Sequence, residues 1–202
     1  MPVSMSEQAK KPYHHGELRE TLLVAGEAAL HSMPLDAVSL REISRRAGVS
    51  HAAPKHHFST LGELLGEIAA RGFTRFVETL ASAANSASDQ NPAPRMQAMA
   101  RAYLRFAAEN PAVYGLMFGK REQCTTTPNL TKGMLAAWEQ LEGAVADIVG
   151  QQKAVNGALL VWSSVHGMAQ LRIDRKLPPH VDPQSSVEAV TRMIIAGLQA
   201  DT

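Results

Sequence analysis

The chain has 202 residues, of which 45% are hydrophobic, a formal net charge of +1 and a single cysteine, Cys124. This length can hold a small domain joined to a larger one, and the near-zero charge means that any nucleic-acid-binding surface has to be local. A lone cysteine excludes a disulfide framework, and we find neither a signal peptide nor an apolar run of roughly 18 residues. We therefore expect a cytoplasmic protein that does not enter a membrane.

The residue types that dominate the chain favour helices. Aromatic residues make up only 5%, and good helix formers such as Ala, Leu, Met, Glu, Gln and Arg prevail. Residues 1–12 are predicted to form a flexible arm. Beyond them, apolar spacing and capping signals, one of them a capping box at Ser185 and Glu188, predict an all-α fold of three short helices followed by six more. The expected helices cover approximately 17–31, 40–47 and a short stretch from 51, then 61–84, 95–110, 111–119, 128–149, 152–171 and 186–199, with a loop over 85–94.

Residues 39–58 carry the strongest functional motif. Ser39 begins a capping box, Gly48 stops the first helix, and Ser50 is a good N-cap for a second helix. Two short helices joined by a three-residue turn that contains glycine describe a helix-turn-helix, whose second helix enters the major groove of DNA. We therefore predict a DNA-binding domain over residues 13–60.

The polar surface of this motif is basic. Its arginines can neutralise phosphates, and His51 and His56 on the second helix are candidates for contacts with base edges. A solvated basic face is the alternative, but the neighbouring turn signature favours contact with DNA. The predicted DNA-binding residues are Ser39, Arg41, Arg45, Arg46, Ser50, His51, Ala52, Lys55, His56 and His57.

Six of the eight histidines lie in the first sixty residues. Adjacent or i, i+4 histidines can chelate a metal ion, but no Cys, Asp or Glu joins them at ligand spacing. We therefore expect no metal site, and interpret the histidines as DNA-facing or simply exposed. They are His14, His15, His31, His51, His56 and His57.

Residues 13–73 resemble the DNA-binding domain of the tetracycline-repressor (TetR) family of regulators. The resemblance rests on Tyr13–Arg19, Ser39–Ser50, Phe58 and Glu63–Leu65. It implies three N-terminal helices and a six-helix C-terminal domain, here residues 61–202, that binds a ligand and dimerises. It also implies a homodimeric repressor of a near-palindromic operator in double-stranded DNA, released by a small molecule.

Three positions depart from what this resemblance implies. Family members often carry an aromatic residue where Lys55 stands and a lysine where Leu61 stands. Pro54 falls early in the second helix, where it removes a backbone hydrogen bond and predicts a distorted or partly 3₁₀ first turn. The alternative is therefore a helical ligand-binding or interaction protein whose DNA binding is impaired.

Residues 110–118 and 162–167 resemble a TetR subgroup with a Trp…His-Gly element. Trp162 and His166 share a helix face, and a core tryptophan packed on a satisfied histidine is the alternative to a ligand contact. Met and aromatic side chains also line adaptable apolar pockets. By analogy with the family, we expect a small apolar effector. The predicted pocket residues are Phe76, Met99, Tyr103, Phe106, Tyr114, Met117, Phe118, Trp138, Trp162 and His166.

The last two helices are apolar on more than one face. Gly157, Ala158, Gly167 and Gly197 would allow close approach of helices, and a two-fold four-helix interface would bury the surplus apolar surface. A core contained within one chain is the alternative. The predicted dimer-interface residues are Leu160, Val161, Val165, Met168, Leu171, Val190, Met193, Ile194 and Leu198.

Catalytic motifs are weak throughout the chain. We find no nucleophile elbow, phosphate loop, dinucleotide fingerprint or zinc-protease motif. Ser163, His166 and Asp174 could form a triad only on paper, because the first two share a helix without a strained turn. Cys124 falls in a polar loop, where a redox-sensitive thiol is the alternative, but a lone exposed cysteine is more often inert. The sequence therefore predicts a regulator that is not an enzyme and needs no cofactor.

Overall fold

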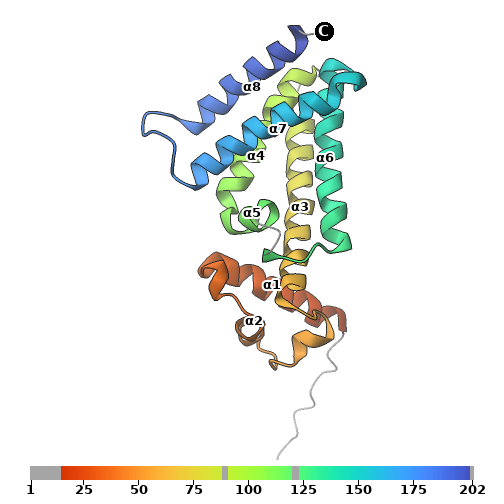
Figure 1. The fold of residues 1–202 in the computed structure, drawn as a ribbon, viewed down its shortest axis with the longest axis vertical. Helices are drawn as coiled ribbons and strands as arrows, with labels where there is room; N and C mark the ends of the chain where they lie inside the picture. Colours follow the sequence, from red (N-terminus) through yellow and green to blue (C-terminus); the bar gives the residue numbers. More distant parts are fainter. Residues whose placement is uncertain (1–14, 88–90, 120–122, 201–202) are drawn as a thin grey trace, which may run out of the picture. The chain divides into compact units, whose positions relative to one another are not determined.

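The computed structural model describes residues 15–87, 91–119 and 123–200, and all their regular elements are helical (Figure 1). This confirms the all-α prediction. These residues form two compact units, one that ends at Leu61 and one that starts at Gly62. The predicted arm over residues 1–12, and Tyr13 and His14 of the TetR-like segment, lie outside the described residues.

From residue 15 on, the first unit holds two α-helices and two short 3₁₀ helices, where three helices were expected. Its elements are α1 (His15–Ser32), η1 (Leu35–Ala37), α2 (Leu40–Arg46) and η2 (Ala53–His56). The Ser39 hydroxyl accepts a hydrogen bond from the Glu42 N–H at 3.2 Å and so caps α2, as predicted. The small core of the unit consists of buried side chains, among them Leu22, Leu23, Ala29, Ile43 and Phe58.

The second helix of the predicted motif is a 3₁₀ turn, and Pro54 explains why. Proline has no N–H to donate to the carbonyl of Ser50, and the N–H of Ala53 takes that carbonyl at 3.0 Å. Lys55 then bonds three residues back, to Ala52, at 3.3 Å. Bonds of this spacing define a 3₁₀ helix. The prediction of an α-helix from His51 is therefore wrong, whereas the predicted distortion at Pro54 is observed.

The second unit contains six α-helices within the described residues. They are α3 (Leu61–Ser86), α4 (Pro92–Glu109), α5 (Pro111–Phe118), α6 (Pro128–Val149), α7 (Gln151–Ile173) and α8 (Pro183–Ala200). In Figure 1, α3 and α6 run alongside each other in the same direction. Two hydrogen bonds at different levels agree with this arrangement, from Asn129 to Glu67 at 2.9 Å and from Gln140 to the Val77 carbonyl at 3.2 Å. Helix α7 packs against α4, α6 and α8.

The loop before α4 and the start of α8 differ from the predictions. The loop over 85–94 is shorter, because α3 continues to Ser86 and α4 starts at Pro92, where a first-turn proline is tolerated. Helix α8 is capped by Asp182, whose carboxylate accepts from the Ser185 N–H at 2.8 Å, so the predicted cap at Ser185 is wrong. Among the described residues, no helix is long and apolar enough to cross a membrane.

Candidate functional site

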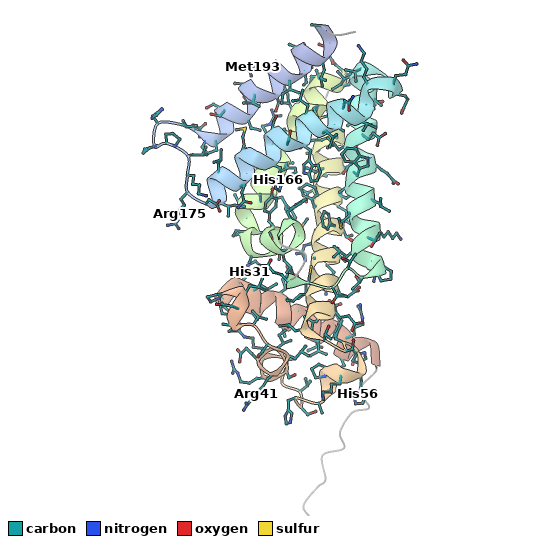
Figure 2. All side chains as sticks on the ribbon, viewed as in Figure 1. His31, Arg41, His56, His166, Arg175 and Met193 are labelled. Carbon is teal, nitrogen blue, oxygen red and sulfur yellow. The ribbon has the colours of Figure 1, made fainter. Side chains whose placement is uncertain are left out.

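The predicted DNA-binding residues lie on α2, on η2 and in the turn between them. Gly48 has a φ of +68° in this turn, a backbone conformation that glycine adopts without strain. Figure 2 shows Arg41 and His56 projecting outward from this unit. Eight of the ten predicted side chains are exposed, namely those of Ser39, Arg41, Arg45, Ser50, His51, Ala52, Lys55 and His56, while Arg46 and His57 are half-buried.

The three arginines of α2 occupy different environments. Arg45 and Arg46 both pair with Glu42, at 2.7 Å and 2.8 Å. The hydrogen bonds from Arg45 and then Arg46 lower the pKa of Glu42 to about 2. Arg46 also donates to the Ser32 hydroxyl at 2.7 Å and to the Ala28 carbonyl at 3.3 Å, near the end of α1. Arg46 therefore braces α2 against α1, whereas Arg41 is exposed.

An apolar cavity of about 140 Å³ lies inside the second unit. Seven of the ten predicted pocket residues line it, namely Phe76, Met99, Tyr103, Met117, Phe118, Trp138 and Trp162. Phe106 does not line it but packs edge-on against Phe76, with ring centroids 5.2 Å apart. The sequence did not identify the remaining lining residues as pocket members, since apolar side chains of a helical core look alike: Phe73, Leu80, Met96, Ala100, Met134, Ala137, Leu141, Val161 and Val165.

A more open groove of about 660 Å³ adjoins the cavity, because Met117, Phe118, Met134 and Trp162 line both. His166 lines this groove, and Figure 2 shows it in the middle of α7. Phe118 and Trp162, whose ring centroids are 6.5 Å apart, stand at the junction of groove and cavity. The two hollows can therefore hold parts of one molecule.

A polar cluster lies beside both hollows. The hydroxyls of Tyr103 and Tyr114 are 3.0 Å apart and lie 2.8 Å and 2.7 Å from Nδ1 of His166. Burial raises the pKa of Tyr103 to about 12, against the lowering effect of hydrogen bonds from Tyr114 and Trp162. Burial also raises the pKa of Tyr114 above its usual range and lowers that of His166. All three groups are therefore uncharged at neutral pH.

The imagined catalytic groups form hydrogen bonds with other partners rather than with one another. The Ser163 hydroxyl donates to the Leu160 carbonyl at 3.1 Å, and Nδ1 of His166 faces the two tyrosines instead. Asp174 accepts hydrogen bonds from Gln170 and Lys176. Cys124 lines the groove, and burial raises the pKa of its thiol, so the unreactive protonated form is favoured.

The predicted dimer-interface residues do not all face outward. Val161 and Val165 are 3% and 2% exposed and line the cavity, so their assignment to the interface is wrong. The hydrophobic pattern of α7 could not distinguish the two faces, because both are apolar. Three of the predicted residues are strongly exposed, namely Leu160, Leu171 and Met193, and four are half-buried, namely Met168, Val190, Ile194 and Leu198.

The segment before α6, together with the first two residues of α6, is fastened to the start of α3. The N–H of Thr125 donates to the Gly62 carbonyl at 2.9 Å, and Asn129 donates to Glu67 in the next turn of α3. A side chain at Gly66 would collide with the carbonyl oxygen of Thr125, so the close approach requires glycine there. We call residues 123–129 the strap. Two of its residues, Cys124 and Thr126, also line the groove.

Comparisons with known proteins agree with this architecture. Residues 96–194 match the family model described as "Tetracyclin repressor-like, C-terminal domain". The HTH-type transcriptional activator FasR of Mycolicibacterium smegmatis is 24% identical over 187 residues, which cover 90% of this chain and 83% of FasR.

Two solved structures extend the comparison to the whole fold. A protein of unknown function from Rhodococcus sp. RHA1 is 31% identical, with a TM-score of 0.82, over 94% of this chain and all of that one. The TetR-family regulator PfmR from Thermus thermophilus is 20% identical, with a TM-score of 0.64, over 87% of this chain and 97% of PfmR. At that identity, the likeness to PfmR concerns the fold.

Proposed function

The chain belongs to the TetR family of transcriptional regulators, and we propose that it is a homodimeric repressor that a small molecule releases from DNA. The observation that carries the proposal is the exposed cationic surface formed by α2, the Gly48 turn and η2. A regulator of this kind would act where the bacterial chromosome lies, in the cytoplasm.

Contact with DNA is supported by the side chains that remain accessible. Arg41 and Lys55 are exposed, and both can neutralise phosphates. His51 and His56 are exposed at the turn and on η2, so their ring nitrogens are available to base edges. The assignment of Arg46 is revised, because its guanidinium is held by α1 and Glu42.

Dimerisation is supported by the outer surface of α7 and α8. Leu160 is 46% exposed and Met193 is 71% exposed, an arrangement that costs free energy unless a partner covers it. A side chain built at Gly167 or Gly197 would meet no neighbour within 4 Å, so both glycines leave room for another helix. Gly157 differs, because it packs on Val145 within the chain. A two-fold dimer would place two DNA-binding units one duplex turn apart, roughly 34–36 Å.

The strap offers a route from ligand binding to DNA release. It lines the groove through Cys124 and Thr126 and is hydrogen-bonded to the first turns of α3. Helix α3 starts at Leu61, the last residue of the first unit. A ligand that displaces the strap would therefore break the hydrogen bond to the Gly62 carbonyl, next to Leu61, where the first unit ends and α3 begins.

Binding to DNA from beside the protein's own gene tests the proposal directly. Fluorescence anisotropy should detect a dimer on a near-palindromic site, with an affinity that falls as salt rises. Lys55→Glu should weaken binding to every sequence and flatten the salt dependence. Lys132→Glu, the same charge change at an exposed position of α6, is the matched control and should bind as wild type does. Equal binding by Lys55→Glu and wild type would refute the placement of Lys55.

A reporter gene downstream of the same DNA then separates repression from activation. Deleting the gene for this protein should raise expression of the reporter if it is a repressor.

A second candidate function is favoured by η2, because a 3₁₀ turn presents less surface to a groove than an α-helix does. In that case the protein would bind small molecules but no DNA at any salt concentration.

A further inference from the structure

The polar cluster of Tyr103, Tyr114 and His166 contains more contacts than its protons can fill. Each of the three pairs of polar atoms lies within 3.0 Å. When His166 carries its proton on Nε2, only two hydroxyl protons are available for these three contacts. They satisfy two contacts, and the Nε2–H remains outside the triangle. Within the described residues, the hydrogen bonds of His166 are made by Nδ1 alone.

The other tautomer leads to the same result. With the proton on Nδ1, the Nδ1–H donates to the hydroxyl of one tyrosine, and that hydroxyl donates to the hydroxyl of the other tyrosine. The proton of this last hydroxyl has no acceptor within the cluster. Either arrangement leaves one donor available. With the proton on Nε2, the free donor belongs to His166, which lines the groove. With the proton on Nδ1 and the order His166 to Tyr114 to Tyr103, the free donor is the Tyr103 hydroxyl, and Tyr103 lines the cavity. An incoming molecule can meet either donor with a hydrogen-bond acceptor.

The surroundings of the cluster select against charge. None of the described residues that line the cavity or the groove is Asp, Glu, Lys or Arg. The three members of the cluster are uncharged, since burial opposes ionisation of each. A carboxylate placed here would lose its hydration without gaining a countercharge from any described residue that lines the two hollows, which is unfavourable. A carbonyl oxygen is an acceptor without that penalty.

The size of the cavity limits the apolar part of such a molecule. Its volume of about 140 Å³ is close to the roughly 150 Å³ of an engineered apolar cavity that takes up benzene. The groove beside it is larger and contains His166. One ring or a short alkyl chain therefore fits the cavity, while a polar head remains beside the cluster.

We infer that the effector is an uncharged carbonyl compound with a compact apolar group, which enters the cavity past Phe118 and Trp162 while its carbonyl oxygen accepts a hydrogen bond from the His166 cluster. This inference rests on the proposed function, in which a small molecule controls DNA binding.

Three probes that differ only in the head group test this inference on the full-length protein. 4-Phenyl-2-butanone carries a ketone, butylbenzene has no acceptor, and 3-phenylpropionate carries a carboxylate. Binding is followed by fluorescence, because both tryptophans of the chain, Trp138 and Trp162, line the cavity. The ketone should bind about three- to tenfold more tightly than butylbenzene, the advantage of one hydrogen bond. It should bind at least about tenfold more tightly than the carboxylate.

Two variants assign the preference to the cluster. His166→Leu should abolish the advantage of the ketone over butylbenzene, while retained butylbenzene binding shows that the cavity is intact. Ser164→Ala removes a polar group of the same helix that lines neither the cavity nor the groove and whose hydroxyl donates to the Leu160 carbonyl at 2.8 Å, so it should leave the preference unchanged. His166→Gln keeps an N–H donor and should therefore keep part of the preference for the ketone over butylbenzene.

Several outcomes would overturn the inference. They are equal binding of the ketone and butylbenzene, tighter binding of the carboxylate, an unchanged preference in His166→Leu, or binding of none of the three probes. DNA anisotropy with each probe separates this inference from the proposed function. A carboxylate that binds and releases DNA would overturn only the inference, whereas a ketone that binds as expected without affecting DNA would count against ligand release.

Discussion

Replacing Arg46 and Arg41 separately by alanine would distinguish the residue that braces α2 against α1 from the surface that we propose contacts DNA. The Arg46 guanidinium donates to the Ser32 hydroxyl at 2.7 Å and to the Ala28 carbonyl at 3.3 Å, and its side chain is 25% exposed. Arg41 is exposed on the same helix. The two variants remove the same charge from α2, but only one removes a link between α1 and α2.

The expected loss of stability follows from these contacts. A hydrogen bond from a charged donor contributes about 1.5–3 kcal/mol when buried, and partial exposure and the long 3.3 Å contact reduce this. Arg46→Ala should therefore lower the free energy of unfolding by about 1–2 kcal/mol in total, measured by urea denaturation. Arg41→Ala should change it by less than about 0.5 kcal/mol, as is usual for surface substitutions.

DNA binding should show the reverse order. Arg41→Ala should reduce the slope of log K against log salt concentration by about one for each DNA-bound protomer, the effect of one lost phosphate contact. Arg46→Ala should leave this slope nearly unchanged at temperatures where the variant is folded. A stable Arg46→Ala variant with a reduced slope would refute our interpretation of Arg46 as a brace.

Three further predictions concern pH, ligand coupling and assembly. Burial lowers the pKa of His166 in the folded state below its ordinary 6.5, so the unfolded state binds the proton more readily. The contribution of His166 to the free energy of unfolding is therefore complete above pH 6.5 and is lost as the pH falls below that value. Urea unfolding between about pH 5 and 8 should show that His166→Gln loses less stability than wild type as the pH falls. An equal loss of stability in both proteins would exclude His166 as the source of the pH dependence. Gly66→Ala should displace the strap from α3 and reduce the effect of a bound ligand on DNA affinity, whereas Gly143→Ala, where a side chain meets nothing within 4 Å, should leave that effect intact. Met193→Glu should shift the proposed dimer towards monomer in analytical ultracentrifugation. Val24→Glu, at a 55% exposed position of α1, should leave the oligomeric state unchanged. A Met193→Glu dimer as stable as that of wild type would contradict the proposed interface.

The helices and several of their ends could be predicted because the interactions that define them are local. Ser39 and Thr127 cap α2 and α6 through bonds to N–H groups three residues later. Gly48 and Gly150 end helices with positive φ values. Even the distortion at Pro54 follows from a single missing N–H. At α8 the prediction from Ser185 failed, because Asp182 stands three residues earlier and its carboxylate accepts from the Ser185 N–H.

The assignment of helix faces depended on tertiary structure. Leu160 and Val161 are adjacent and equally apolar, yet one is 46% exposed and the other is 3% exposed and lines the cavity. The polar cluster unites residues from α4, α5 and α7, with His166 63 positions after Tyr103. The sequence by itself therefore determined the helical class, the capped helix α2 with the glycine turn that follows it, and the family, because capping and turn signals act within a few residues. Only the packing of distant helices decided which apolar side chains enclose the cavity and which polar ones meet there, because burial depends on neighbours that local spacing does not specify.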